Sequence, residues 1–283
     1  MGRRDVREKS GMSAPIWKNA KSVLRDPKMA RAYAAWWWGA LTGHPRLRIE
    51  GGLDIGGFRH FSEFWGTSNG LPTPAELALI RRCLGNGGMA LDVGANIGIF
   101  ALTMAAINSR TTVHAFEPVA SNYARLAGNI ELNRCANVQG HELAVAATSG
   151  FVRMTSDDRS PATNRISIEA SAPRVASITL DEFCASRAIA EVDLLKIDVE
   201  GAEPLVLGGA ATLLTRRHVK AILIEICPKN LDLFGFTVGD LSRPLRAAGY
   251  SLYRLGHDGA TGAALGDEDL GRIVLENVVA LPA

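Results

Sequence analysis

The feature that most constrains the fold is a predicted strand, glycine-rich turn and helix that follow one another over residues 88–102. The apolar run from Met89 to Val93 is short and bounded by glycines, which is typical of a buried strand. Gly94-Ala-Asn-Ile-Gly98 predicts a tight turn, and the apolar spacing from Ile97 to Ile107 predicts a helix. Glycines let the backbone approach a ligand, and free N–H groups at a helix start can face it. We therefore expect a nucleotide site at this turn.

The residues of the turn indicate which kind of nucleotide it binds. A dinucleotide fingerprint reads G-x-G-x-x-G, whereas this stretch reads D-x-G-x-N-x-G and starts at Asp92. The missing second glycine disfavours a nicotinamide oxidoreductase. A carboxylate beside the turn suits a ligand with a cationic amino group better than a pyrophosphate. We therefore expect S-adenosylmethionine as the cofactor, bound by Asp92, Gly94, Ala95, Asn96 and Gly98.

Composition indicates an ordinary globular protein. The chain has 283 residues, of which 47% are hydrophobic and 21% charged, so a large core needs no disulfides. Its four cysteines lie far apart, which favours free thiols in a reducing compartment. No apolar stretch approaches the ~20 residues of a membrane span, and we expect a cytoplasmic protein.

Charge is distributed unevenly along the chain. Residues 1–31 hold nine basic and three acidic residues, a net charge of +6. The whole chain has a net charge of +2, so the rest of the chain has a net charge of −4. An acidic body argues against a nucleic-acid partner. Residues 1–13 are polar, and residues 16–24 have helical spacing. The triplet Trp36-Trp37-Trp38 lies in a second predicted helix with basic flanks, so residues 14–43 could contact a membrane surface or a second copy of the chain.

Alternating strands and helices predict an α/β fold. Beyond residue 88 the pattern is βαβαβ, which favours a parallel sheet with right-handed crossovers. Residues 1–70 form an expected N-terminal extension, and residues 71–283 the main domain, with an insertion of strand pieces and a mobile loop over 151–178. Seven sheet strands are predicted, at residues 89–93, 112–116, 138–145, 192–199, 219–226, 251–255 and 273–281.

Polar residues gather where the predicted strands end. Ligands of open α/β sheets bind outside the carboxyl ends of the strands, near the topological switch point. Glu117 and Pro118 follow the second strand, and a carboxylate there can accept both ribose hydroxyls. The third strand's end is expected to meet an adenine ring through Glu142 and Leu143. The fourth and fifth strands end at Asp198, Glu200 and Glu225.

The sequence resembles the FkbM family of S-adenosylmethionine-dependent methyltransferases across roughly residues 70–255. The matching segments are Leu91-Asp-Val-Gly-Ala-Asn-Ile-Gly98, Phe116-Glu-Pro118, Thr179-Leu-Asp-Glu182 and Leu195-Lys-Ile-Asp-Val-Glu-Gly-Ala-Glu203. The resemblance implies a class I, Rossmann-like methyltransferase fold: a seven-stranded, mostly parallel sheet with helices on both faces and an antiparallel last strand. It also implies O-methylation of a hydroxyl on a sugar, glycan or secondary metabolite. Residues 1–70 lie outside the match.

Transfer of a methyl group to a hydroxyl requires loss of a proton, by a general base or by a metal that lowers the hydroxyl's pKa. Asp198 is the predicted base or metal ligand, assisted by Glu200 and Glu225. Converging carboxylates suit Mg²⁺, with Asp198 and Glu225 as candidate ligands. Lys196 is expected to pair with a buried carboxylate, with either a structural or a functional role, while Glu203 suits dipole compensation at a helix start. A non-catalytic nucleotide-binding protein, and methylation of nitrogen or carboxylate, are the alternatives.

Overall fold

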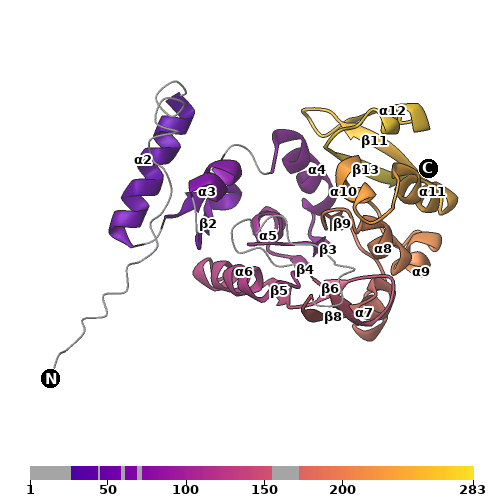
Figure 1. The fold of residues 1–283 in the computed structure, drawn as a ribbon, viewed down its shortest axis with the longest axis horizontal. Coiled ribbons are helices and arrows are strands. Elements are labelled where there is room, and N and C mark those ends of the chain that lie inside the picture. Colours follow the sequence, from indigo (N-terminus) through magenta and orange to yellow (C-terminus); the bar gives the residue numbers. More distant parts are fainter. Residues whose placement is uncertain (1–26, 44, 59–60, 69–71, 155–171) are drawn as a thin grey trace.

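The computed structural model describes residues 27–43, 45–58, 61–68, 72–154 and 172–283 (Figure 1). The predictions for residues 1–13 and 16–24 lie outside the described residues, as does most of the expected loop within 151–178.

A central sheet organises the described part of the chain. Its order is β12-β11-β13-β10-β9-β3-β4-β5, and the five strands from β10 to β5 are parallel. β13 runs antiparallel to both β10 and β11. The bounds are β3 (Gly88–Val93), β4 (Thr111–Phe116), β5 (Val138–His141), β9 (Leu194–Ile197), β10 (Ile222–Ile226), β11 (Tyr250–Leu255), β12 (Thr261–Ala264) and β13 (Glu276–Pro282).

Helices cover both faces of this sheet because its strands carry apolar residues on both sides. One face, with Ala90, Leu194 and Leu223, packs against α4 (Pro74–Leu84), α5 (Ile99–Ile107) and α6 (Ala120–Leu132). The other, with Leu91, Leu195 and Ile224, packs against α7 (Leu180–Ser186), α8 (Glu203–Gly208), α9 (Ala211–Thr215) and α11 (Val238–Ala247). Two further short helices are α10 (Pro228–Asp232) and α12 (Asp267–Gly271).

The strand order places a topological switch point between β3 and β9. From β3 the chain runs outward through β4 to β5, then returns to β9 on the other side of β3. The connections leaving the carboxyl ends of β3 and β9 therefore diverge, which opens a crevice there in folds of this kind.

Two features of the sheet differ from the sequence-based expectation. The predicted third strand ends at His141, and β6 (Ala144–Val145) joins a separate three-stranded sheet with β7 (Gly150–Arg153) and β8 (Arg174–Ile178). The main sheet has an eighth strand, β12, which pairs antiparallel with β11. The first difference comes from the pairing of β6 with the distant β8, which local periodicity does not reveal, whereas β12 forms a hairpin with the preceding strand β11.

The N-terminal segment contacts the domain through α5 and α6. It comprises α2 (Pro27–Thr42), β1 (Leu47–Arg48), a 3₁₀ turn at Glu50–Gly52, β2 (Asp54–Ile55) and α3 (Phe61–Ser68). The Asn129 amide accepts a hydrogen bond from the Gly56 N–H at 2.8 Å, and the Asn133 amide accepts one from the Asp54 N–H at 2.7 Å. The proposed division of the chain at residue 70 remains a prediction.

Helix caps follow the sequence closely in one case and partly in another. Thr73 and Glu76 form the complete capping box of α4. Thr179 accepts the Glu182 N–H at 3.1 Å, but the Glu182 carboxylate binds the Ser149 hydroxyl, and that hydroxyl accepts the Thr179 N–H. A serine from before β7 thus completes the cap of α7.

Candidate active site

The glycine turn between β3 and α5 has the backbone that its sequence predicts. Gly94 and Gly98 have φ values of 84° and 95°, where only glycine is unstrained, and Asn96 has a φ of 49°. A β-carbon on Gly98 would lie 2.7 Å from the Leu126 side chain, so this glycine also permits contact between the turn and α6. The glycines are thus required by the turn itself and by packing within the protein.

Protein groups already occupy several N–H groups of this turn. The N–H groups of Gly94 and Ala95 both donate to the Phe116 carbonyl, at 3.0 and 2.9 Å. The Gly98 N–H donates to the Ala95 carbonyl at 2.8 Å, and the Asn96 N–H donates to the Glu117 carboxylate at 2.9 Å. These four N–H groups are therefore engaged within the protein, and the free N–H groups expected at the helix start belong to α5, which begins at Ile99. The Oδ1 of Asn96 is buried without a hydrogen-bond partner among the described residues, so it can meet a ligand.

Glu117 lies directly after β4 and is held by backbone groups. Its Oε1 accepts the Val119 N–H at 2.9 Å, and its Oε2 accepts the Asn96 N–H. Burial raises the pKa of Glu117 to about 7, against the opposing effect of these hydrogen bonds. The Asn122 side chain also hydrogen-bonds to this carboxylate, which leaves part of its acceptor capacity for the predicted contact with the ribose. Pro118, which follows it, is half-buried.

A buried ion pair spans the switch point. Asp92 and Lys196 are register partners on β3 and β9, and the Lys196 Nζ lies 3.8 Å from the Asp92 Oδ1 and 3.0 Å from the Asp198 Oδ2. Burial alone would lower the pKa of Lys196, but the carboxylates of Asp198 and Asp92 raise it above its ordinary value. The Asp92 side chain is 0% exposed. Lys196 is thus a cationic neighbour of Asp92, and both Asp92 oxygens lack a hydrogen-bond partner among the described residues. The expected contact of Asp92 with a ligand's amino group stays a prediction.

Carboxylates cluster around Glu225, the penultimate residue of β10. Burial raises the pKa of Glu225 to about 8, with further upward contributions from Asp198, Glu200 and Glu203 and a downward one from Lys196. The three predicted catalytic residues Asp198, Glu200 and Glu225 thus lie within electrostatic reach of one another. At neutral pH Glu225 is mostly protonated, so it is suited to donating a hydrogen bond.

The turn after β9 is held from within the protein. The Glu203 Oε1 accepts the N–H groups of Val199 and Gly201 at 3.0 and 3.1 Å, so Glu203 has the structural role expected of it. Glu200 has a φ of 56°, and its Oε2 accepts the Asn230 amide N–H at 2.8 Å. These contacts fix the backbone that carries Asp198.

The expected adenine-contacting residues lie where β5 leaves the main sheet. Glu142 is exposed and Leu143 is half-buried between the two sheets. Beneath them, the ring nitrogens Nδ1 of His114 and Nε2 of His141 lie 3.1 Å apart. Burial lowers the pKa of His141 to about 4, so this ring is neutral and supports the strand end without charge.

The predicted Mg²⁺ ligands do not form a metal site. Nowhere in the described ranges do three or more His, Cys, Asp or Glu side chains gather as a ligand set. Asp198 instead binds the Lys196 ammonium, which already supplies a positive charge.

Three residues of the site had no functional signal in the sequence. The Lys196 Nζ lies 4.5 Å from the centre of the Phe100 ring, which forms a cation–π contact from α5. Asn277, the register partner of Glu225 on β13, donates to the Glu76 carboxylate of the α4 cap. Phe100, Asn277 and Glu76 are distant in sequence, and only the fold brings them to this face of the sheet.

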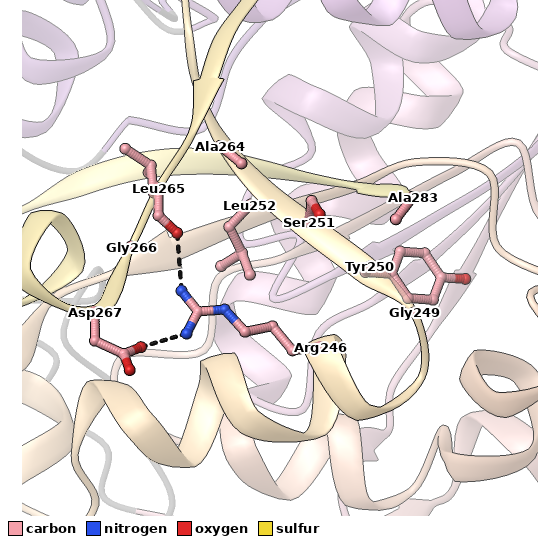
Figure 2. Close-up of a pocket in the computed structure, with 10 residues that line it drawn as sticks. All are labelled: Arg246, Gly249, Tyr250, Ser251, Leu252, Ala264, Leu265, Gly266, Asp267 and Ala283. Atoms are coloured by element: carbon pink, nitrogen blue, oxygen red, sulfur yellow. Dashed lines mark hydrogen bonds and ion pairs between the residues drawn. The ribbon is translucent and has the colours of Figure 1, made fainter.

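A pocket of about 580 Å³ lies elsewhere, at the amino end of β11 (Figure 2). The Arg246 guanidinium donates to the Leu265 carbonyl at 2.8 Å and pairs with Asp267, as Figure 2 shows. None of the predicted site residues lines this pocket. It is therefore separate from the strand ends that carry the candidate site.

Helix α2 packs mainly on α3 and stands at one side of the molecule (Figure 1). Tyr33 and Trp36 make edge-to-face contacts with Phe61, whereas Trp38 and Leu41 are 71% and 76% exposed. Contact of this helix with a membrane or a second copy remains a prediction. Among the helices of the described residues, none has the length and apolar character needed to cross a bilayer.

The fold and this site define a class. The strand order, the antiparallel β13, the glycine turn after β3 and the acidic residues at the ends of β4 and β9 are those of a class I, Rossmann-like methyltransferase. The sequence profile of the methyltransferase FkbM domain matches residues 92–252, more than half of the chain. The chain belongs to the FkbM methyltransferase family.

Two curated relatives support this assignment. Methyltransferase 1 of Beauveria bassiana is 26% identical over 167 residues, which cover 50% of this chain and 66% of that protein. The 31-O-demethyl-FK506 methyltransferase FkbM of Streptomyces tacrolimicus is 30% identical over 155 residues, and the match covers 44% of this chain and 59% of that protein. The chain therefore matches less than two thirds of the length of either relative.

Solved structures with a similar arrangement include two methyltransferases. The methyltransferase FkbM of Methylobacillus flagellatus is 15% identical, with a TM-score of 0.43 over 69% of this chain and 44% of that one. The magnesium protoporphyrin IX methyltransferase of Synechocystis, with SAM bound, is 12% identical. Its TM-score is 0.42, and the match covers 74% of this chain and 76% of that one.

Proposed function

We propose that this chain is an S-adenosylmethionine-dependent O-methyltransferase that acts on a hydroxyl of a sugar, glycan or secondary metabolite. The observation that carries the proposal is the position of Asp198, which directly follows β9 at the switch point and is held by Lys196 at 3.0 Å. The relative named for a 31-O-demethyl substrate supports oxygen as the accepting atom.

Each residue has a role in this proposal. Glu117 accepts the ribose hydroxyls, Glu142 and Leu143 border the adenine, and the turn from Gly94 to Gly98 supports the cofactor. S-adenosylmethionine supplies an electrophilic sulfonium methyl group when bound. In-line positioning of the acceptor provides much of the rate.

Asp198 removes the proton from the acceptor hydroxyl as its oxygen bonds to the methyl carbon. When bound, the cofactor would take up the electron pair of the broken carbon–sulfur bond on sulfur and would leave as a neutral thioether. Protonated Glu225 can donate a hydrogen bond to the same carboxylate or to the acceptor, and Glu200 maintains the turn through Asn230.

Calorimetric titration with S-adenosylhomocysteine and with NAD tests cofactor choice. We expect binding of S-adenosylhomocysteine alone, and binding of NAD alone would overturn the proposal. Transfer of labelled methyl groups to a panel of sugars and polyketides, followed by mass spectrometry, tests the acceptor. Methylation confined to nitrogen or carboxylate would replace the hydroxyl assignment, and no transfer at all would favour a non-catalytic nucleotide-binding protein.

Asp198→Asn tests the base. We expect it to retain S-adenosylhomocysteine binding and to lower kcat by roughly 10²–10⁴-fold. The exposed Asp232 provides a matched control, since Asp232→Asn should leave both unchanged. Full turnover by the Asp198→Asn variant would remove Asp198 from the mechanism.

A further inference from the structure

We propose that Lys196 is the built-in cation of this site, whose ammonium takes the place of a divalent metal ion between Asp92 and Asp198 and holds Asp198 for proton removal. This inference rests on the proposed function and identifies how its base is positioned. Lys196 acts through Asp198 and is therefore a positioning residue.

The location of Lys196 is unusual for a lysine. It lies in the central strand β9 with neighbours Leu195 and Ile197 fully buried, and its own side chain is 3% exposed. Lysine side chains are almost never fully buried unless they are paired. The pairing here extends over both sides of the switch point, to Asp92 on β3 and to Asp198 after β9.

Stability alone is a weak reason for such an arrangement. A buried ion pair gains little over a well-packed apolar replacement, because the desolvation penalty offsets most of the Coulombic attraction. An apolar residue at position 196 would suit the sheet, whose neighbouring residues on this face are Leu194 and Leu223. The positive charge of Lys196 is therefore better explained by its attraction for the Asp92 and Asp198 carboxylates at the strand ends.

The Lys196 ammonium lies closer to the Asp198 carboxylate than to the Asp92 carboxylate. The Nζ donates a hydrogen bond to the Asp198 Oδ2 at 3.0 Å, whereas the Asp92 Oδ1 lies at 3.8 Å. The Phe100 ring contacts the ammonium from α5. Asp92 and Phe100 thus stabilise the charge, and Asp198 receives the directed bond.

A metal ion would compete for the same position. Mg²⁺ requires oxygen ligands at roughly 2.0–2.1 Å in octahedral geometry, and the ammonium already occupies the space between these two carboxylates. The other acidic groups facing Lys196 and Asp198 are Glu225, Glu200 and Glu203. Glu203 is engaged by two backbone N–H groups, and Glu200 by Asn230. We therefore expect methyl transfer without a divalent cation.

Metal titration tests the cation role without an acceptor. Mn²⁺, which is visible in electron paramagnetic resonance, is titrated into the wild-type protein, Lys196→Met and the matched control Lys220→Met, whose lysine is half-exposed in ion pairs with Asp193 and Glu191. We expect Mn²⁺ affinity to rise roughly tenfold or more in Lys196→Met alone, because its carboxylates lose their cation. The inference would be overturned if the wild-type protein bound Mn²⁺ as tightly as Lys196→Met does and if Asp198→Asn abolished that binding.

A double variant separates positioning from folding. Lys196→Met leaves Asp92 buried and unpaired, so Asp92→Asn/Lys196→Met should regain much of the lost stability. We expect its kcat for methyl transfer to stay roughly tenfold or more below wild type, with the KM for S-adenosylmethionine little changed. Recovery of wild-type kcat in the double variant, or loss of wild-type turnover in EDTA that Mg²⁺ restores, would refute the role. Absence of S-adenosylhomocysteine binding by the wild-type protein would instead refute the proposed function.

Discussion

A β-carbon placed on Gly94 would lie 1.8 Å from the carbonyl oxygen of Asp198. The turn after β3 and the residue that follows β9 thus touch backbone to backbone, and the Asp198 N–H donates to the Val93 carbonyl at 3.0 Å. The same contact that closes the switch point positions the predicted base beside the cofactor turn. Any side chain at position 94 would push these two strand ends apart.

Gly94→Ala should therefore damage both folding and the site. The φ of 84° is unfavourable for alanine, and the clash is with backbone, which cannot rotate away. We expect a loss of more than about 2 kcal/mol in the free energy of unfolding, measured with urea, together with weaker S-adenosylhomocysteine binding. Gly128→Ala is the control, because its β-carbon would meet open space on α6 and should raise stability by up to about 1 kcal/mol. Equal effects of the two substitutions would contradict this account.

Asn129 links the N-terminal segment to the cofactor turn, and its removal should destabilise both. Its amide accepts the Gly56 N–H and donates to the Ile97 carbonyl, each at 2.8 Å, and its side chain is buried. Asn129→Ala leaves two buried groups unpaired, so we expect a loss of about 2–4 kcal/mol in urea unfolding. The exposed Gln139 offers the comparison, since Gln139→Ala should change stability by less than about 0.5 kcal/mol. A loss in Asn129→Ala no larger than that would show that the link contributes little.

Binding of S-adenosylhomocysteine should strengthen as pH rises through 7. Burial raises the pKa of Glu117 to about 7, and the ionised carboxylate is the stronger acceptor for ribose hydroxyls. Calorimetry between pH 6 and pH 8 should show increasing affinity in the wild-type protein, and weaker affinity with less pH dependence in Glu117→Gln. The exposed Glu131 on α6 supplies the control, because Glu131→Gln should keep the wild-type profile. A profile unchanged in Glu117→Gln would exclude this carboxylate as the source.

Stability should fall between about pH 5 and pH 8 because of Glu225. Its pKa is about 8 in the folded protein against 4.5 as the ordinary value, so the native state binds the proton more tightly over this range. Stability then decreases with rising pH. Glu225→Gln should have a higher free energy of unfolding than wild type at pH 9, by at least about 1.4 kcal/mol, and a similar value at pH 5. Glu268→Gln, at a side chain 81% exposed, should show no such difference. A wild-type curve as flat as that of Glu225→Gln would refute the prediction.

The local sequence determined most elements of the main sheet and its parallel central part. An apolar run bounded by glycines identified β3, and further short apolar runs identified β4 and β9, because short buried strands depend on neighbouring residues. The motif at Leu195–Glu203 indicated the family, which the profile match confirmed. The candidate residues at the strand ends followed from a general rule about parallel sheets.

Only the tertiary structure decided what these residues do to one another. Asp92 was expected to meet a ligand, and the register of β3 and β9 places the Lys196 ammonium 3.8 Å from its carboxylate, a neighbour that the local sequence does not reveal. Pairing of β3 with β4 brings Phe116 and Glu117 to the turn, where they accept hydrogen bonds from the N–H groups of Gly94, Ala95 and Asn96. The separate β6–β8–β7 sheet arises from long-range hydrogen bonding between β6 and β8. The sequence by itself thus determined which chemical groups stand at the strand ends, and the packing of distant segments decided which charges neutralise each other, because burial and distance set those energies.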